Sequence, residues 1–468
     1  MIDTLRLTAE EAMRLVESRE VSADELHEAY LEAIGSRDGE LHSYLRTVEE
    51  ANGTSIPIAL KDVISTQGVE TTAGSKILAG YVPVFDATVA ARCRQAGLPV
   101  IGKTNTDEFA MGSSTENSAY GPSRNPWDPE RVPGGSGGGS SAAVTAGLTP
   151  WALGSDTGGS IKQPSALCGN VGLRPTYGTV SRYGVVAFAS SLDQIGPVAK
   201  TVRDTALLYR IISGRDPADS TTVELPHAGE LPDAERLDGL RVGVPTELND
   251  HPGIEAGVRE ATRKAIDLLA ELGASVDECS LPRSVEYGLP CYYLIAPAEA
   301  SSNLARYDGV RYGPREAGDT YREMVERTRD AGFGDEPKRR IMLGTYALSA
   351  GYYDAYYGQA QKVRTLIIRE HAEAFERFDV LASPTSPTVA FTVGERSSDP
   401  LAMYASDLLT IPSCMAGLPG LNVPIGLSDG LPVGLQLVGR QFAENTLFRA
   451  GHALERAIGF EYVPGRLA

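Results

Sequence analysis

Residues 132–164 constrain the fold and chemistry of this chain more than any other stretch. They hold two serines flanked by glycines, Ser136 in G-G-S-G-G-G and Ser160 in D-T-G-G-S, with small and apolar residues between them. Glycine permits positive φ and a close approach of a ligand to the backbone. Free N–H groups beside a hydroxyl suit acyl transfer, which needs a nucleophile and an oxyanion site. One such cluster is typical of a flexible loop, whereas two clusters around a buried segment indicate a catalytic site.

Apolar runs that alternate with helical patterns predict an α/β fold. Strands are expected at residues 56–60, 98–101, 151–154, 240–244, 274–276, 379–382 and 433–438, and helices at 86–97, 140–147, 254–272 and 443–458. Helices are expected to dominate residues 292–378. Such alternation favours a mixed central β-sheet covered by helices on both faces. We therefore expect one α/β domain over residues 1–468.

Two capping boxes mark the N-terminal region. Thr8 with Glu11, and Ser22 with Glu25, each precede an amphipathic run, which predicts two short helices, the second ending near Gly35. We expect these helices, about residues 1–35, to pack on the main domain. Residues 213–238 are polar and contain proline, and they are interpreted as a surface excursion because β-α-β patterns lie on both sides.

Composition excludes several classes of protein. No apolar run approaches the roughly 20 residues of a membrane span, and the N-terminus lacks the basic start and apolar core of a signal peptide. The five cysteines are widely spread with no C-x-x-C pair, which favours reduced thiols in the cytoplasm and no metal site. The net charge of −18 disfavours broad contact with nucleic-acid phosphates.

Residues 97–104 match the G-x-x-x-x-G-K-T pattern of a phosphate-binding loop. The four residues between the glycines, L-P-V-I, are typical of a buried strand, and Pro99 removes an N–H that a phosphate cradle would use. We interpret this segment as a strand.

The pattern G-x-S-x-G around Ser136 also fits the nucleophile elbow of α/β-hydrolases. That mechanism needs a histidine base downstream, and none of the candidates lies in a motif typical of an active site: His227, His251, His371 and His452. A lysine can serve instead when burial lowers its pKa. Lys61 ends an apolar run and is followed by Asp62, although a lysine in such a place is ordinarily solvated.

Three segments resemble the amidase signature family: P-I-A-L-K-D at 57–62, G-G-S-G-G-G-S-S-A-A-V at 134–144 and G-S-D-T-G-G-S-I-K-Q-P at 154–164. Further segments, at 103–128, 174–184, 190–197, 301–313, 338–357 and 400–412, are similar to the branch of that family that releases ammonia from glutamine for the modification of glutamate on tRNA. The resemblance covers nearly the whole chain.

Carried over position by position, the resemblance implies a Ser–Ser–Lys triad. Ser160 would be the nucleophile, Ser136, after a cis peptide bond, would relay the proton, and Lys61 would be the base. The resemblance also implies an oxyanion hole and a glutamine site formed by the following groups: the backbone N–H groups of Thr157, Gly158, Gly159 and Ser160, and the side chains of Tyr292, Arg340 and Asp407. Three departures from the family pattern are Gly137, where a second serine is usual, Lys162, where arginine is usual, and the segment at 49–57, which is shorter than usual.

The implied substrate is glutamine, with Arg340 on its α-carboxylate and Asp407 on its α-ammonium. An arginine offers the two-pronged donor that a carboxylate accepts. The resemblance further implies a heterotrimer with subunits B and C, in which a partner binds ATP, Mg²⁺ and tRNA and this chain holds no cofactor. The alternative within the family is a free-standing amidase acting on another small amide. A catalytically silent scaffold protein is disfavoured by the intact triad.

Overall fold

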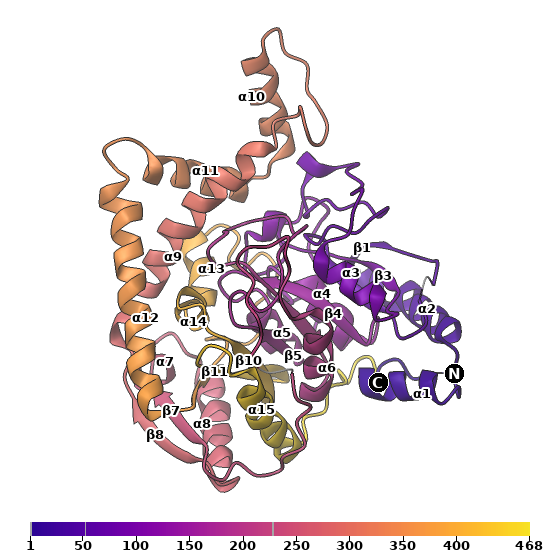
Figure 1. Cartoon of the computed structure of the whole chain (residues 1–468), viewed down its shortest axis with the longest axis vertical. Coiled ribbons are helices and arrows are strands. Elements are labelled where there is room, and N and C mark those ends of the chain that lie inside the picture. The colour runs from indigo at the N-terminus through magenta and orange to yellow at the C-terminus, as the bar shows by residue number, and fades with distance from the viewer. Residues whose placement is uncertain (1, 52, 227–228) are drawn as a thin grey trace.

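The computed structural model describes residues 2–51, 53–226 and 229–468. An 11-stranded sheet runs through this part of the chain in the order β1-β3-β2-β4-β6-β5-β10-β11-β9-β7-β8 (Figure 1). The strands are β1 (Tyr44–Thr47), β2 (Ile58–Lys61), β3 (Val100–Thr104), β4 (Trp151–Asp156), β5 (Val171–Arg174), β6 (Gln194–Ala199), β7 (Arg241–Pro245), β8 (Ser275–Cys279), β9 (Val380–Pro384), β10 (Gly420–Ser428) and β11 (Leu431–Gly439).

The sheet is mixed, which confirms the expected fold class. β2 pairs in parallel with β3 and β4, and β7 with β8 and β9, while the other pairs are antiparallel. The apolar runs did not reveal β1, β5, β6 or β10. β6 contains Pro197, and β10 contains Pro424 and Gly426, where the register shifts. Proline and glycine argue against a strand assignment from sequence, although bulges accommodate both.

Helices cover both faces of the sheet. They are α1 (Ala9–Glu17), α2 (Ala23–Leu41), α3 (Thr88–Gln95), α4 (Gly138–Thr145), α5 (Lys162–Cys168), α6 (Val202–Ile212), α7 (Thr246–Asn249), α8 (Ala256–Glu271), α9 (Pro282–Asn303), α10 (Tyr321–Gly332), α11 (Asp335–Leu348), α12 (Gln359–Arg377), α13 (Pro400–Tyr404), α14 (Ile411–Met415) and α15 (Glu444–Ile458). Along β10, Leu421 and Val423 pack against Gly451 of α15. The intervening Asn422 donates to the Asn170 carbonyl, just after α5. Because successive strand residues point to opposite faces, α15 and α5 lie on opposite sides.

Both N-terminal capping boxes are present, with Thr8 and Ser22 as the N-caps of α1 and α2. The expected end of the second helix near Gly35 was wrong, because α2 continues to Leu41. A glycine costs a helix only about 1 kcal/mol, and burial of α2 on both sides of Gly35, up to Leu41, outweighs that cost. The helix ends where His42 takes left-handed angles.

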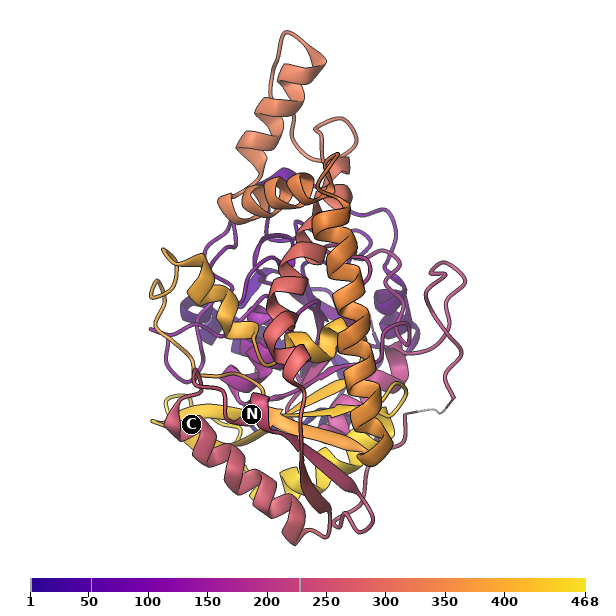
Figure 2. The same ribbon diagram turned by 90° about the vertical axis from the view of Figure 1, so that its left-hand side faces the viewer.

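Residues 292–378 are largely helical, as expected. α9 packs against α11 and α12, and α10 projects beyond the rest of the fold in two views (Figures 1 and 2). In the described parts of 213–238 there is no named helix or strand, whereas residues 227–228 lie outside the description. Among the described helices, none is long and apolar enough to cross a membrane. All five cysteines are free.

Candidate active site

Two neighbouring parallel strands bring the predicted lysine and the second glycine cluster together. β2 ends at Lys61 and β4 ends at Asp156, and the strands are aligned with Leu60 opposite Leu153. Parallel strands end at the same edge of a sheet, so the turn after Asp156 lies beside Lys61. Ser136 comes just before α4, which packs on β2 and β4.

Lys61 is buried and directed at Ser136. Its Nζ donates to Ser136 Oγ at 2.7 Å and to the Ser155 carbonyl at 3.3 Å. Burial lowers the pKa of Lys61 to about 7, although nearby carboxylates, among them Asp107 and Asp156, oppose that shift. A lysine with this pKa is substantially neutral at physiological pH and can accept a proton. Lys61 is therefore not solvated, unlike most lysines that end a strand.

A backbone hydrogen bond joins the two serine clusters. The Gly137 N–H donates to the Ser160 carbonyl at 3.1 Å, and the Gly135–Ser136 peptide is cis, as the family resemblance implies. Within the described part of the chain, Ser160 Oγ makes no hydrogen bond, and Ser160 is 6% exposed. The hydroxyl is therefore free to meet a substrate.

The turn after β4 carries backbone donors that are not used inside the protein. In the described structure, no hydrogen bond is made by the N–H groups of the four residues at 157–160: Thr157, Gly158, Gly159 and Ser160. Asp156, which the sequence reasoning missed, anchors the turn because its Oδ2 accepts the Ile161 N–H at 3.0 Å. Arg174 pairs with the same carboxylate at 2.9 Å. Unused, fixed N–H groups of this kind suit the oxygen of a tetrahedral intermediate.

Tyr292 lies beside this turn. It is buried on α9, and a Cβ added to Gly158 would come within 2.9 Å of its ring carbon Cζ. Glycine at 158 therefore lets the tyrosine ring pack directly on the backbone of the turn.

Asp407 ends the 3-10 helix η5 (Ala405–Asp407) and presents a carboxylate oxygen without a partner. Its Oδ2 accepts from Ser113 Oγ at 2.6 Å, whereas its buried Oδ1 has no hydrogen bond within the described structure. Burial raises the pKa of Asp407 to about 7. A cation at Oδ1 would favour the ionised carboxylate, so the site suits an ammonium group.

Ser113 also links Asp407 to the first serine cluster. Gln163 Nε2 donates to the Ser113 carbonyl, and Gln163 Oε1 accepts the Gly135 N–H, both at 3.0 Å. The sequence reasoning missed this connection because no sequence pattern marks a glutamine three residues after the predicted nucleophile.

Arg340 is buried on α11 and already has an acidic partner. Its Nε donates to Glu336 Oε1 at 2.7 Å, and its guanidinium lies 5.4 Å from the ring centres of Tyr293 and Tyr404. A cavity of about 220 Å³ opens here, lined in part by Arg340, Glu336 and Tyr404. Within the described structure, the two terminal nitrogens of the guanidinium make no hydrogen bond, which leaves them available for a carboxylate.

The structure accommodates two of the departures from the family pattern, Gly137 and Lys162. Gly137 lacks the side chain that is usual at this position, and its N–H donates to the Ser160 carbonyl. Lys162 is buried, and its Nζ donates to Ser413 Oγ at 2.9 Å and to Gln436 Oε1 at 3.3 Å.

The competing motifs find no support in the structure. Residues 100–104 form the buried strand β3, as expected, and Lys103 Nζ bonds the Ile64 carbonyl at 2.6 Å. None of the described histidines contacts Ser136 or Ser160 by a hydrogen bond, and the ring nitrogens of His371 and His452 lie instead near the Ile367 carbonyl and Glu455. His227 lies outside the described residues.

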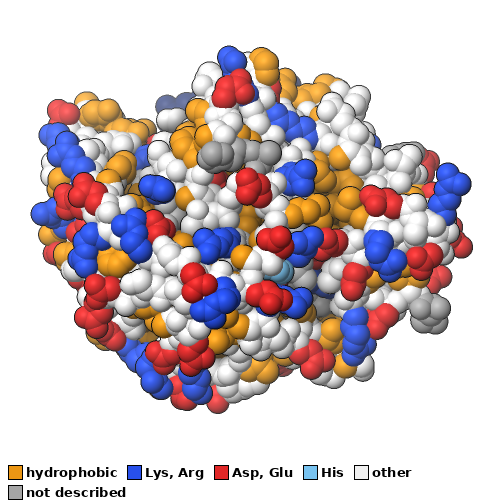
Figure 3. Space-filling model, turned by 60° about the horizontal axis from the view of Figure 1, so that its bottom comes forward, with side chains coloured by type: hydrophobic (Ala, Val, Ile, Leu, Met, Phe, Trp, Pro, Cys, Tyr) orange, Lys and Arg blue, Asp and Glu red, His pale blue; other side chains and the backbone are white. Residues whose placement is uncertain are grey.

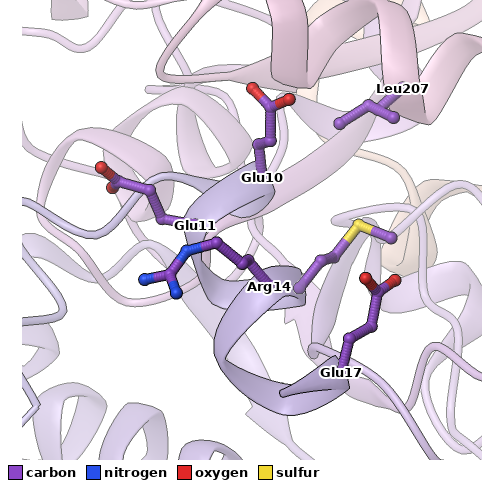
Figure 4. A pocket seen from close by; sticks show the side chains of 6 residues that line it. Glu10, Glu11, Arg14, Glu17 and Leu207 are labelled. Atoms are coloured by element: carbon purple, nitrogen blue, oxygen red, sulfur yellow. The ribbon is translucent and has the colours of Figure 1, made fainter. Parts of the chain in front are cut away.

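A second hollow, of about 470 Å³, lies apart from these residues between α1 and α6. Figure 4 shows Glu10, Glu11, Arg14 and Glu17 around it, with Leu207 from α6. It contains none of the residues expected at the active site. Among the described residues, no group of three or more His, Cys, Asp or Glu is arranged to hold a metal ion.

Comparison with known proteins shows the family of the chain. The profile of the Amidase family matches residues 40–448. The chain belongs to the amidase family. This amidase is 56% identical to the A subunit of glutamyl-tRNA(Gln) amidotransferase from Roseiflexus sp. (strain RS-1), with 96% of each chain covered. It is also 56% identical to the protein of the same name from Moorella thermoacetica, again with 96% of each chain covered.

Solved structures extend the comparison. The amidase resembles the A subunit of glutamyl-tRNA(Gln) amidotransferase from Thermotoga maritima with a TM-score of 0.84 and 48% identity, covering 97% of this chain and 96% of that one. It also resembles the peptide amidase of Stenotrophomonas maltophilia with a TM-score of 0.83 and 28% identity, covering 99% of each chain.

Proposed function

We propose that this amidase is the A subunit of a glutamyl-tRNA(Gln) amidotransferase and that it hydrolyses glutamine to supply ammonia. The contact of Lys61 Nζ with Ser136 Oγ at 2.7 Å, made by a buried lysine whose pKa is about 7, carries the catalytic part of this proposal. The choice of glutamine as the substrate is supported by the full-length relatives that bear this name. We also propose that residues 1–468 act as one amidase domain in the cytoplasm.

The proposed first step forms an acyl-enzyme on Ser160. Its Oγ attacks the side-chain amide carbon of glutamine while its proton passes through Ser136 to neutral Lys61. The negative oxygen of the tetrahedral intermediate accepts hydrogen bonds from the N–H groups of residues 157–160. The C–N bond then breaks, and the amide nitrogen takes a proton back along the same path and leaves as ammonia.

Water completes the proposed cycle. It attacks the γ-glutamyl ester, gives its proton to the same lysine and serine path, and releases glutamate while Ser160 recovers its proton. The ammonia passes to partner subunits B and C, one of which activates tRNA-bound glutamate with ATP and Mg²⁺. No residue of this chain is assigned to ATP or to a metal.

The amino-acid end of glutamine is proposed to lie between Asp407 and Arg340. Asp407→Asn is expected to lower kcat/KM for glutamine by tens- to thousands-fold, because loss of a desolvated charge contact costs roughly 2–5 kcal/mol. A neutral aryl amide should be affected far less. The measurement is kcat/KM for both substrates in the wild type and the variant.

The matched control is Asp267→Asn, which makes the same change at an exposed position on α8. Arg340→Lys tests the carboxylate end while keeping a cation beside Glu336, since lysine lacks the planar fork of arginine. If kcat/KM falls equally for glutamine and for the neutral amide, Asp407 and Arg340 have a structural role and a free-standing amidase is favoured. If the wild type preferred the neutral amide, the assignment of glutamine as the substrate would be wrong.

The proposal leaves tRNA binding to a partner. The chain carries a net charge of −18. On the face shown in Figure 3, the basic side chains of the described residues are interspersed with acidic ones. We expect the isolated chain to show no tight binding of tRNA in a filter or fluorescence assay at about 50–200 mM salt. Tight binding that weakens steeply with salt would contradict this division of labour.

Glutaminase activity of the chain, alone and with its co-purified partners, tests the overall proposal. Release of glutamate and ammonia from glutamine is the expected result. A free-standing amidase would instead hydrolyse another small amide without partners, and a scaffold protein would hydrolyse neither.

A further inference from the structure

Thr410 contacts the turn that carries the proposed oxyanion donors. It is buried directly before α14, three residues beyond Asp407. Its Oγ1 donates to the Gly158 carbonyl at 2.6 Å and lies 3.1 Å from the Asp407 carbonyl, so the shorter contact is the one to Gly158. In the described structure, Gly158 O accepts no other hydrogen bond. Thr410 is thus its only partner there.

Gly159 makes this contact possible. It has φ of 142°, a value that favours glycine. A Cβ at this position would overlap Thr410 Oγ1. The threonine and the glycine turn therefore fit only because residue 159 has no side chain.

Because of the geometry of the peptide group, the contact of Thr410 with the Gly158 carbonyl also fixes the direction of the Gly159 N–H. A trans peptide is planar, so its C=O and N–H point in opposite directions. The Gly158 carbonyl shares one peptide group with the Gly159 N–H. Holding the carbonyl toward Thr410 therefore directs the Gly159 N–H away from Thr410, in a fixed direction. The next peptide group is held independently, because the Gln163 N–H donates to the Gly159 carbonyl at 2.8 Å.

The chain also holds Thr410 itself in place. The Thr410 N–H donates to the Asp407 carbonyl at 3.1 Å. Lys162, one of the departures from the family pattern, donates to the Thr410 carbonyl at 3.4 Å and to Ser413 Oγ at 2.9 Å. Thr410 is thus part of a buried network rather than a freely rotating side chain.

We propose that Thr410 is a positioning residue that aims the Gly159 N–H into the oxyanion hole. The inference rests on the proposed function, because it concerns the same site. In this proposal the Thr410 hydroxyl acts through the backbone, because it donates to the Gly158 carbonyl. The effect should therefore appear in the chemical step for any amide, and not in the recognition of glutamine.

The test compares Thr410→Val with Thr410→Ser in the full chain purified with its partner subunits. Valine keeps the shape and removes the hydroxyl. Loss of a whole oxyanion donor costs about 10²–10³ in kcat, so a misdirected donor should cost roughly 10- to 100-fold. We expect this loss in kcat for both glutamine and a neutral amide, with KM changed less than about threefold, and near-normal kcat in the serine variant. Thr205→Val is the matched control, because that buried hydroxyl donates to the Thr201 carbonyl at 2.9 Å on α6.

A second measurement does not depend on glutamine. A fluorophosphonate probe is attacked by Ser160 Oγ, so an O–P bond forms, the P–F bond breaks and fluoride leaves, while the serine proton passes through Ser136 to Lys61. The phosphoryl oxygen then occupies the oxyanion hole. Labelling, followed by intact mass, should slow in Thr410→Val by a factor similar to that for kcat and stay normal in Thr410→Ser.

Normal kcat and labelling in Thr410→Val would overturn the inference. An equal loss in Thr410→Ser, or a loss confined to KM, would overturn it as well. A wild type that labels at Ser160 but leaves glutamine intact would reject the proposed function, while the labelling rates would still decide the role of Thr410.

Discussion

Ser160→Ala is expected to lower kcat for glutamine by on the order of 10⁴- to 10⁶-fold, the range seen when a serine nucleophile is removed. The fold should be retained. In the described structure the Ser160 hydroxyl has no hydrogen-bond partner to leave unsatisfied, and the side chain reaches solvent. The measurement is initial-rate ammonia release, together with thermal unfolding of both proteins.

Ser141→Ala is the matched control for this experiment. It lies in the same serine-rich segment, on α4, and its buried Oγ has no hydrogen-bond partner within the described structure. We expect full activity from it. A γ-glutamyl adduct trapped on a serine other than Ser160 would reject the assignment of the nucleophile.

Lys61→Met and Lys61→Arg are both expected to lose activity by on the order of 10³-fold or more, since a positioned base contributes about 10²–10⁴ on its own. Methionine retains much of the apolar stem but cannot accept a proton. Arginine stays protonated. In the wild type, kcat/KM should rise with pH through about 7, because Lys61 acts as a base only when it is neutral and burial lowers its pKa to about 7.

Lys76→Arg provides the control for Lys61→Arg, because Lys76 is exposed on the 3-10 helix Lys76–Leu78. Retention of activity by Lys61→Met would assign the base to another group. If the wild-type rate did not decrease when the pH is lowered from about 7, the ionisation of Lys61 would not limit the reaction.

The fold class was predictable from sequence because hydrophobic runs report burial directly. The strands missed by that reasoning include β6 and β10, which contain proline. β6 pairs with β4 and β10 pairs with β5, and both partners are distant in the sequence. The two serines were predicted from the glycine-rich motifs around them, and Lys61 from the apolar run that it ends together with the resemblance to the amidase signature family. The structure places Lys61 against Ser136, whereas the roles of all three remain predictions.

The supporting network was not predictable, because its members come from distant segments. Gln163, Ser113 and Asp407 are joined only when the chain folds. Arg340 was expected to face substrate, but sequence alone did not reveal its ion pair with Glu336. Such contacts depend on three-dimensional packing, which local sequence patterns do not reveal.

The order of the strands has a consequence for how the chain is made. β10 and β11 begin after residue 419, yet they lie between β5 and β9 in the middle of the sheet. The strands synthesised earlier therefore cannot join into one sheet until residues 420–439 have left the ribosome. Pairings between segments this far apart form slowly. Asp407 and Thr410 shortly precede β10, so the proposed nucleophile at position 160 is synthesised long before these groups, and the proposed site can be completed only after they have been made.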